Sequence, residues 1–157
     1  MPRGYLIAYK KWMRTVHKSE HTAYQIHYHF VFPVKYRKAI FGRKDREQTL
    51  FRICKEIEKR YEVEFEQIGV DENHVHYLLS AAPKYAPSDI ARIVKSLTGR
   101  EMFVRHPDLR KELWGGELWT NGYFVATVGE GGNRDVIRQY VAQQGRRDAK
   151  QCKLFDF

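Results

Sequence analysis

The sequence has little cysteine and no long apolar segment. Its 157 residues contain only two cysteines, Cys54 and Cys152, which excludes a disulfide framework and a cysteine-based zinc site. No apolar run approaches the roughly 20 residues that cross a bilayer, and the apolar stretch near the basic N-terminus is too short for a signal peptide. We therefore expect a cytoplasmic protein without a membrane partner.

Several nucleotide- and phosphate-handling motifs are also missing. The G-x-x-x-x-G-K-[ST] loop of phosphate-binding NTPases does not occur, so no nucleotide cofactor is expected. The aromatic signature of RRM-type RNA-binding domains is absent. The chain also lacks the pair of H-x-[ST] motifs that two-histidine phosphoesterases require.

Positive charge is in excess. Lys and Arg number 28 against 19 Asp and Glu, which gives a formal net charge of +9. This surplus favours a polyanionic partner, most commonly nucleic acid, although a protein with a merely basic face has the same composition. The hydrophobic share of 43% and the length are typical of one globular domain.

We predict two segments. Residues 1–21 form a basic N-terminal extension without clear periodicity, either an arm on DNA or, as we favour, a frayed end. Residues 22–157 form a single domain in which no linker, repeat or low-complexity tract is visible.

The domain alternates between strand and helix periodicities. Strands are predicted over 24–34, 63–70, 74–81 and 123–128, and helices over 45–61, 88–99 and 134–146. Pro33 should end the first strand or place that strand at an edge of the sheet, and Gly69 marks a plausible bulge. Ser88 and Gly99 bound the second helix. Residues 100–113 look like a looser basic segment.

This order, β-α-β-β-α-β followed by one helix, predicts a ferredoxin-like α+β fold. Both helices between strands should cover one face of the antiparallel sheet. The other face should stay open for a ligand or for the C-terminal helix.

His74-Val75-His76 is the sharpest chemical feature. Residues two apart on a strand share a face, so both imidazoles can reach one metal ion. Because the alternate residues are apolar, the two histidines should point to the open side of the sheet. The alternative is two polar residues on a half-solvated strand. His27 and His29 lie on the same kind of face and are expected to be solvated or to face DNA.

The last predicted helix supplies a second feature, Tyr140 and Gln144, which are four apart and share a helix face. Read alone, Tyr140 could simply extend the core stripe of its helix. Together with a histidine pair and strong positive charge, it suggests a tyrosine nucleophile assisted by a divalent metal. Phosphate oxygens and water in the remaining positions suit Mg²⁺ or Mn²⁺.

These residues resemble a known family, the single-tyrosine HUH transposases of prokaryotic insertion sequences. The resemblance runs from about Thr22 to Gln144. Its landmarks are Tyr28-His29, Lys35-Tyr36-Arg37, Asp71-x-Asn73-His74-Val75-His76, Lys95-Ser96-Leu97, Leu118-Trp119, the run from Tyr123 to Gly129, and Tyr140-Val141-x-x-Gln144.

By this resemblance, His74, His76 and Gln144 are metal ligands and Tyr140 is the catalytic nucleophile. The implied activity is DNA transposition, in which single-stranded DNA with hairpin ends is cleaved and rejoined through a 5′-phosphotyrosine intermediate. The implied assembly is a homodimer with composite active sites, and Gly129, Gly131 and Gly132 would form the hinge before the catalytic helix.

Candidate DNA-binding residues combine basic and aromatic side chains. They are Lys35, Tyr36, Arg37, Lys38, Arg92, Lys95, Arg100 and Trp119. For each of these charges the alternative is plain solvated surface, and for Trp119 the equally weighted alternative is a place in the core. Two other functions remain open: a host-domesticated relative that processes repeated palindromes, and a non-catalytic nucleic-acid-binding domain.

Overall fold

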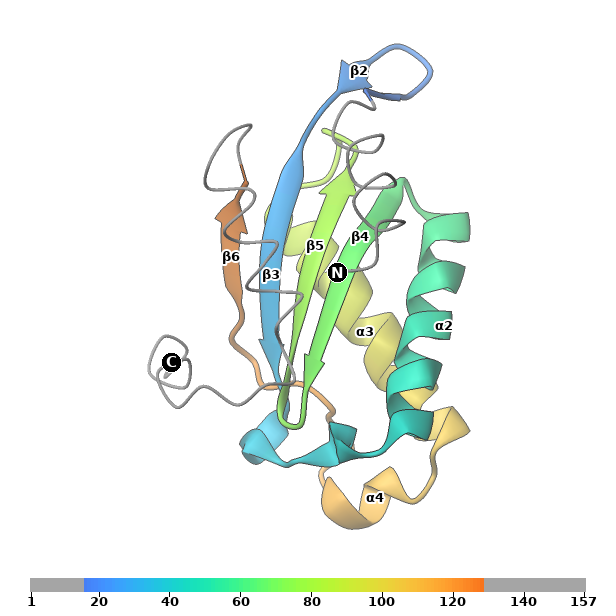
Figure 1. Ribbon diagram of the computed structural model, residues 1–157, viewed down its shortest axis with the longest axis vertical. Helices are drawn as coiled ribbons and strands as arrows, with labels where there is room; N and C mark the ends of the chain where they lie inside the picture. Colours follow the sequence, from blue (N-terminus) through green and yellow to red (C-terminus); the bar gives the residue numbers. More distant parts are fainter. Residues whose placement is uncertain (1–15, 129–157) are drawn as a thin grey trace, which may run out of the picture.

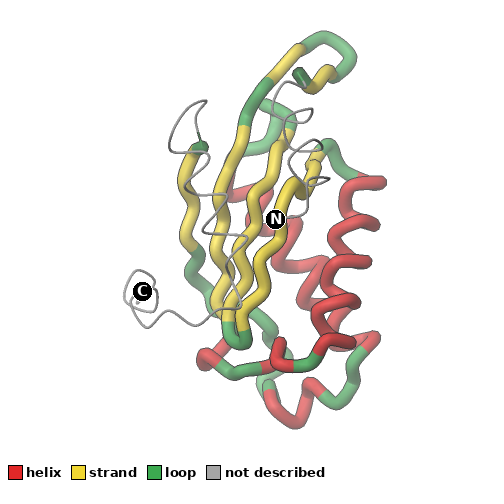
Figure 2. Tube along the Cα trace, in the orientation of Figure 1, coloured by secondary structure: helices red, strands yellow, loops and turns green. Residues whose placement is uncertain are grey.

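The structure, a computed structural model, describes residues 16–128. In this range a four-stranded antiparallel sheet, ordered β4-β5-β3-β6, carries two long helices on one face (Figures 1 and 2). The elements of the sheet and its cover are β3 (His27–Pro33), α2 (Lys44–Arg60), β4 (Val63–Asp71), β5 (His74–Ala81), α3 (Pro87–Arg105) and β6 (Phe124–Thr127). The smaller elements are β1 (His17–Lys18), β2 (Ala23–Tyr24), η1 (Lys35–Arg37), η2 (Ile40–Gly42) and α4 (Leu109–Glu112).

This connectivity confirms the ferredoxin-like prediction. The first and third strands of the sheet, β3 and β5, are central and pair with each other, and each also holds one edge strand. The expected C-terminal helix lies outside the described residues. No helix within residues 16–128 is long and apolar enough to cross a membrane.

The core lies between the sheet and the two helices. Period-two alternation sends Phe30 and Phe32 of β3 toward the helices, where they meet Tyr77 of β5. The apolar periodicity that predicted a helix over 45–61 is the stripe of Leu50, Ile53, Cys54, Ile57 and Tyr61. On α2 the first four are buried against this face and Tyr61, just after the helix, packs partly buried on the core. Cys54 is a free thiol. Burial of this apolar surface is the main stabilising term of the fold.

The first predicted strand is divided in two. Residues 23–24 pair with His17–Lys18 in a separate two-stranded sheet, and β3 starts only at His27. The expected end at Pro33 is confirmed. Residues 16–21, the described part of the N-terminal extension, are therefore held by strand pairing rather than frayed. The ring of His17 also stacks on that of Tyr24, with centroids 5.4 Å apart.

The bulge in β4 is not at Gly69. The register shifts between Phe65 and Gln67, so Glu66 is the extra residue. Gly69 pairs regularly with His76. The prediction chose Gly69 because glycine tolerates bulge geometry. The apolar alternation, however, already changes phase between Phe65 and Ile68, which is where the bulge lies.

The second long helix is longer than predicted at both ends. Pro87 is its first residue, and the Ala86 amide donates to the Asp89 carboxylate at 3.0 Å, so Ser88 is not the N-cap. Gly99 lies inside the helix rather than at its end, and α3 continues to Arg105. Burial of Met102 and Phe103 in the core offsets the low helix propensity of one glycine.

The helical position of Gly99 can be tested by Gly99→Ala. A Cβ there would meet Leu118 and Trp119 at ordinary contact distances of 3.7 and 3.9 Å. We expect the free energy of unfolding to rise by about 0.5–1 kcal/mol in urea titrations. The matched control is Gly116→Ala, where φ is +74°, and this variant should be destabilised by about 1 kcal/mol. A loss of stability in Gly99→Ala would contradict a regular helix at this position.

Candidate active site and nucleic-acid interface

His74 and His76 begin β5 on the sheet face opposite the helices, as predicted. Register places His74 opposite Pro33 and His76 opposite Val31 of β3. The two imidazole centroids are 5.0 Å apart. The intervening Val75 belongs to the core on the other face.

The histidine face is not open to solvent at these positions. His74 is 6% exposed and His76 is 0% exposed. The ring of His29 stacks beside that of His76 with centroids 5.2 Å apart, and Phe124 of β6 meets His29 edge-on. The face that was expected to be open is therefore covered at these positions, and the alternative of a half-solvated strand does not hold either. His29 packs against His76, and Phe124 packs against His29.

Each histidine of the pair has its Nδ1 in a hydrogen bond. Nδ1 of His74 is 2.7 Å from the amide oxygen of Asn73, which accepts. Nδ1 of His76 is 2.9 Å from Nε2 of His29. The amide oxygen of Asn73 can only accept, so His74 donates from Nδ1 and carries its metal-binding lone pair on Nε2. Between His76 and His29 one ring nitrogen donates and the other accepts. In both cases the hydrogen bond at Nδ1 orients the imidazole, as the partners of metal-bound histidines do.

Burial keeps two of these rings neutral. It lowers the pKa of His76 to about 2, with smaller contributions from the His29 and His74 rings. Burial also lowers the pKa of His29 to about 4. Neutral imidazole is the form that binds a metal ion. The donor set therefore fits a divalent cation.

The histidines do not complete a metal site by themselves. Within residues 16–128, no three His, Cys, Asp or Glu side chains gather in a way that could hold an ion. A third protein ligand would be a residue of another type or one outside residues 16–128. Gln144, which the sequence suggests for this role, lies outside the described residues, as do Tyr140, Gly129, Gly131 and Gly132.

His27 and His29 were expected to be solvated or to face DNA, and in this structure both are buried. Nδ1 of His27 lies 2.6 Å from Oε1 of Glu66, and both side chains are less than 5% exposed. Glu66 follows Phe65, which faces the core, so alternation places its side chain on the histidine face. The pair was not predicted because His27 and Glu66 are 39 residues apart, and periodicity gives the face of a residue but not its partner.

The basic cluster after β3 lies at the same end of the sheet as His74. The Val34 amide donates to the Asn73 carbonyl at 2.8 Å, and η1 follows at once. Lys35 binds Glu117 at 2.8 Å, and the exposed ring of Tyr36 stacks on Trp114. Arg37 is half-buried and Lys38 is exposed. Trp114 was not among the predicted residues.

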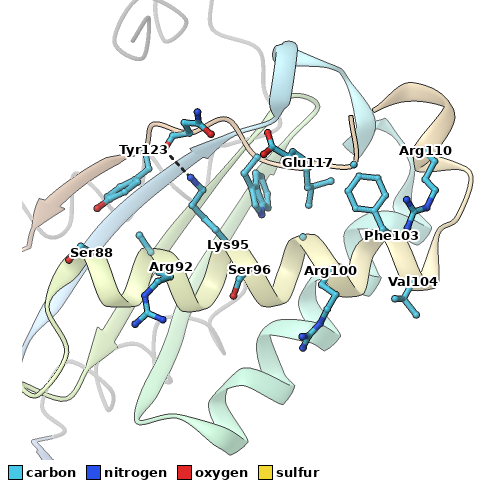
Figure 3. Close-up of a pocket in the computed structure, with 16 residues that line it drawn as sticks. Ser88, Arg92, Lys95, Ser96, Arg100, Phe103, Val104, Arg110, Glu117 and Tyr123 are labelled. Atoms are coloured by element: carbon cyan, nitrogen blue, oxygen red, sulfur yellow. Dashed lines mark hydrogen bonds between the residues drawn. The ribbon is translucent and has the colours of Figure 1, made fainter. Parts of the chain in front are cut away.

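The other predicted cations gather elsewhere. Arg92, Lys95 and Arg100 line a groove of about 740 Å³ between α3 and the segment leading to β6 (Figure 3). Lys95 donates to the Thr120 and Asn121 carbonyls at 2.8 and 3.1 Å, and burial lowers its pKa. Arg110 of α4 adds a fourth cation to the lining of this groove.

Trp119 is corrected from a base-stacking candidate to a core residue. It is 5% exposed, and its Nε1 donates to Thr98 Oγ1 at 2.8 Å. Its ring packs against Phe32 and Phe41. The predicted DNA-binding residues thus fall into two separate groups, one at η1 and one along α3, with Trp119 buried beneath the groove.

Comparison with known proteins gives consistent matches. The model of the family described as "Transposase IS200 like" matches residues 22–144. The chain is 36% identical to the ISDra2 transposase TnpA of Deinococcus radiodurans over 127 residues, which cover 77% of this chain and 85% of that protein. It is 30% identical to the transposase for insertion sequence element IS200 of Salmonella typhimurium over 129 residues, covering 82% of each.

Two solved structures have the same fold. A transposase candidate from Deinococcus radiodurans R1 superposes with a TM-score of 0.64 at 30% identity, covering 83% of this chain and 99% of that chain. A REP-associated tyrosine transposase, solved bound to a REP hairpin, superposes with a TM-score of 0.50 at 12% identity, covering 81% and 70%. The family match over most of the chain, and the identity to insertion-sequence transposases, lead to one conclusion: this chain belongs to the IS200-like transposase family.

Proposed function

We propose that this transposase cleaves and rejoins single-stranded DNA at the ends of an insertion sequence. Tyr140 is the nucleophile and the buried histidine pair is the metal-binding half of the site. The observation that carries the proposal is the orientation of His74 and His76, whose Nδ1 atoms lie 2.7 and 2.9 Å from their partners. Buried imidazoles oriented in this way, of which His76 is kept neutral by burial, are suited to a divalent cation.

The proposed step conserves one phosphodiester bond. The Tyr140 oxygen attacks a DNA phosphorus, the bond from phosphorus to the 3′ oxygen breaks, and that oxygen leaves as a 3′-hydroxyl with a proton. The product is a 5′-phosphotyrosine, and attack by a 3′-hydroxyl reverses the step and joins strands. No nucleotide triphosphate is consumed, in line with the absence of a phosphate-binding loop from the sequence.

The chemistry requires help because a phenol is a weak nucleophile at neutral pH. With a pKa near 10, about one phenol in a thousand is ionised, a deficit of about 4 kcal/mol. A bound Mg²⁺ or Mn²⁺ polarises the phosphate under attack and stabilises its developing charge. His74 and His76 would hold the ion together with Gln144, and Asn73 and His29 would keep the two imidazoles in place.

DNA binding is the task that we assign to the two basic groups. Lys35, Tyr36, Arg37 and Lys38 lie beside the histidine end of the sheet, where a single strand would enter. Arg92, Lys95 and Arg100 line the α3 groove (Figure 3), which suits a hairpin stem. A net charge of +9 favours both contacts.

Two alternatives are less well supported. Processing of palindromic repeats by a host-domesticated enzyme uses the same chemistry, but the REP-associated transposase is only 12% identical, whereas insertion-sequence transposases reach 36% and 30%. A non-catalytic nucleic-acid-binding domain has no need for a buried pair of oriented histidines.

We further propose a homodimer in which Tyr140 of one protomer meets the histidine pair of the other. The glycines at 129, 131 and 132 allow backbone angles closed to other residues, so the segment before the catalytic helix can redirect it. Such a hinge would also carry the attached 5′ end between the two sites during strand exchange.

The nucleophile is tested by Tyr140→Phe. This change removes one oxygen and little packing, so we expect an unchanged fold and no covalent adduct with single-stranded hairpin DNA on denaturing gels. Mass spectrometry of the wild-type adduct should locate the DNA on Tyr140. An adduct at Tyr36 or Tyr123 would contradict the assignment.

The role of His29 is tested by direct metal binding. We expect His29→Leu to weaken Mn²⁺ affinity about 10–100-fold, measured by electron paramagnetic resonance of free Mn²⁺, because the partner that orients His76 is lost. His74→Ala gives the effect of losing a ligand. His106→Gln is the matched control, since His106 contacts Thr49 at 2.7 Å on the helix side. Wild-type affinity in His29→Leu would show that His76 needs no such support.

The composite site is tested by mixing two inactive variants. Neither Tyr140→Phe nor the double variant His74→Ala His76→Ala should cleave alone, but their heterodimer should regain one working site. One protomer then supplies the histidines and the other the tyrosine. Purified heterodimers that stay inactive would place both halves of the site within a single protomer.

A further inference from the structure

Two aromatic rings stand exposed together at the end of the sheet. Tyr36 is 58% exposed and Trp114 is 78% exposed. Their rings are nearly parallel, with an interplanar angle of 16° and centroids 6.1 Å apart. Nζ of Lys35 lies over the Tyr36 ring, 5.7 Å from its centroid. A paired, cation-flanked aromatic surface differs from a single exposed apolar residue, which needs no explanation.

The turn that carries Trp114 is anchored on both sides. Leu113 and Leu118 are 1% and 2% exposed. The Gly116 amide donates to the Leu113 carbonyl at 3.0 Å, and Gly116 takes a φ of +74° that closes the turn. The chain thus buries its leucines before and after Trp114 and presents the indole to solvent.

The backbone under Tyr36 is in an unusual conformation. Tyr36 has a φ of 57° and Arg37 a φ of 53°, two successive non-glycine residues in the left-handed region. The Arg37 amide donates to the Val34 carbonyl at 2.9 Å, which closes this turn. Strained conformations of this kind persist where surrounding structure holds them, and they are frequent at functional sites.

The two aromatic segments are fastened to each other. The Lys35 amide donates to the Leu118 carbonyl at 2.8 Å, and Lys35 Nζ lies 2.8 Å from Glu117. Val34 forms an isolated bridge with Trp119. The spacing of the Tyr36 and Trp114 rings is therefore set by the fold and not by the rings alone.

We propose that Tyr36 and Trp114 form a stacking platform for an unpaired base of single-stranded DNA next to the active site. This inference rests on the proposed function and adds Trp114 to it. Pro33 pairs with His74, and the platform follows shortly beyond Pro33, so a base held there belongs to the strand that enters the histidine face. Lys35 lies over the Tyr36 ring, and the exposed Lys38 follows Tyr36 by two residues, so both are near enough in the chain to bind neighbouring phosphates.

Single-stranded DNA fits this surface better than a protein partner does. Every base offers a flat face for stacking, and the adjoining phosphates match the cations of η1. The platform selects unpaired bases because a base within a regular duplex already has both faces covered. It is also distinct from the α3 groove, since neither Tyr36 nor Trp114 lines that groove.

The test measures binding of a fluorescein-labelled, non-self-complementary single strand of about 20 nucleotides by anisotropy, with EDTA present to prevent cleavage. We expect Trp114→Ala and Tyr36→Ala to weaken affinity about tenfold each, and Trp114→Phe to retain most of it. Tyr85→Ala is the matched control, because Lys84 lies over the Tyr85 ring at 5.2 Å on a loop after the other end of β5. It should bind as the wild type does.

A second measurement reports stacking directly. Binding should quench part of the tryptophan fluorescence of the wild type, and this part should be missing in Trp114→Phe. Equal affinity and equal quenching in all variants would overturn the platform, even if the wild type forms its covalent adduct. If the wild type does not bind single-stranded DNA at all, the proposed function is overturned as well. Loss of dimer mass in Trp114→Ala with unchanged DNA affinity would assign the surface to protein contacts and also overturn the platform.

Discussion

The pairing of β3 with β5 is the constraint on which the rest of the structure depends. Because side chains alternate along a strand, one register decides which residues enter the core and which reach the opposite face. With Val31 opposite His76, the residues Phe30, Phe32, Val75 and Tyr77 face the helices while His29, His74 and His76 meet on the other side. A slip by one residue would bury the wrong set on both faces. Packing of the apolar residues against the helices thus fixes the strand register, and the register fixes where the histidines lie on the opposite face.

The histidine face is buried in a protein of net positive charge, and burial determines the protonation state of its imidazoles. Imidazoles in such a place lose their proton because desolvation disfavours the charged form. His76 is the extreme case, with a pKa of about 2. His76 and His29 are therefore neutral across the physiological pH range. Cations such as Lys38 and Arg92 are exposed, where water and salt screen their charge.

Much of this was visible in the sequence, and the failures have physical causes. The alternation around Phe30 and Val75 and the stripe on α2 predicted the sheet, the core and the face of His74 and His76. The extent of α3 was missed because Gly99 signals a helix end locally, whereas burial of Met102 and Phe103 decides it through tertiary contact.

The environment of the candidate site was harder to predict. The contact between His29 and His76 joins residues 47 apart in the sequence, and periodicity shows which face a residue occupies but not which neighbour it touches. Trp119 and Trp114 illustrate the same point: both are tryptophans in one short segment, and only the packing distinguishes the core residue from the exposed one. The roles of Tyr140 and Gln144 continue to rest on spacing and resemblance.

Glu117 has a consequence for how the basic surface meets a polyanion. Its carboxylate holds Lys35 at 2.8 Å, and it also lines the α3 groove, so one acidic residue touches both basic regions. If the DNA contact proposed for Lys35 forms, the incoming phosphate competes with this carboxylate for the same ammonium group. An exchange of one anionic partner for another releases fewer counterions than the number of cations at the interface suggests. Under the proposed function, Glu117 would thus weaken binding to nucleic acid in general and leave stacking and shape a larger share in choosing the strand.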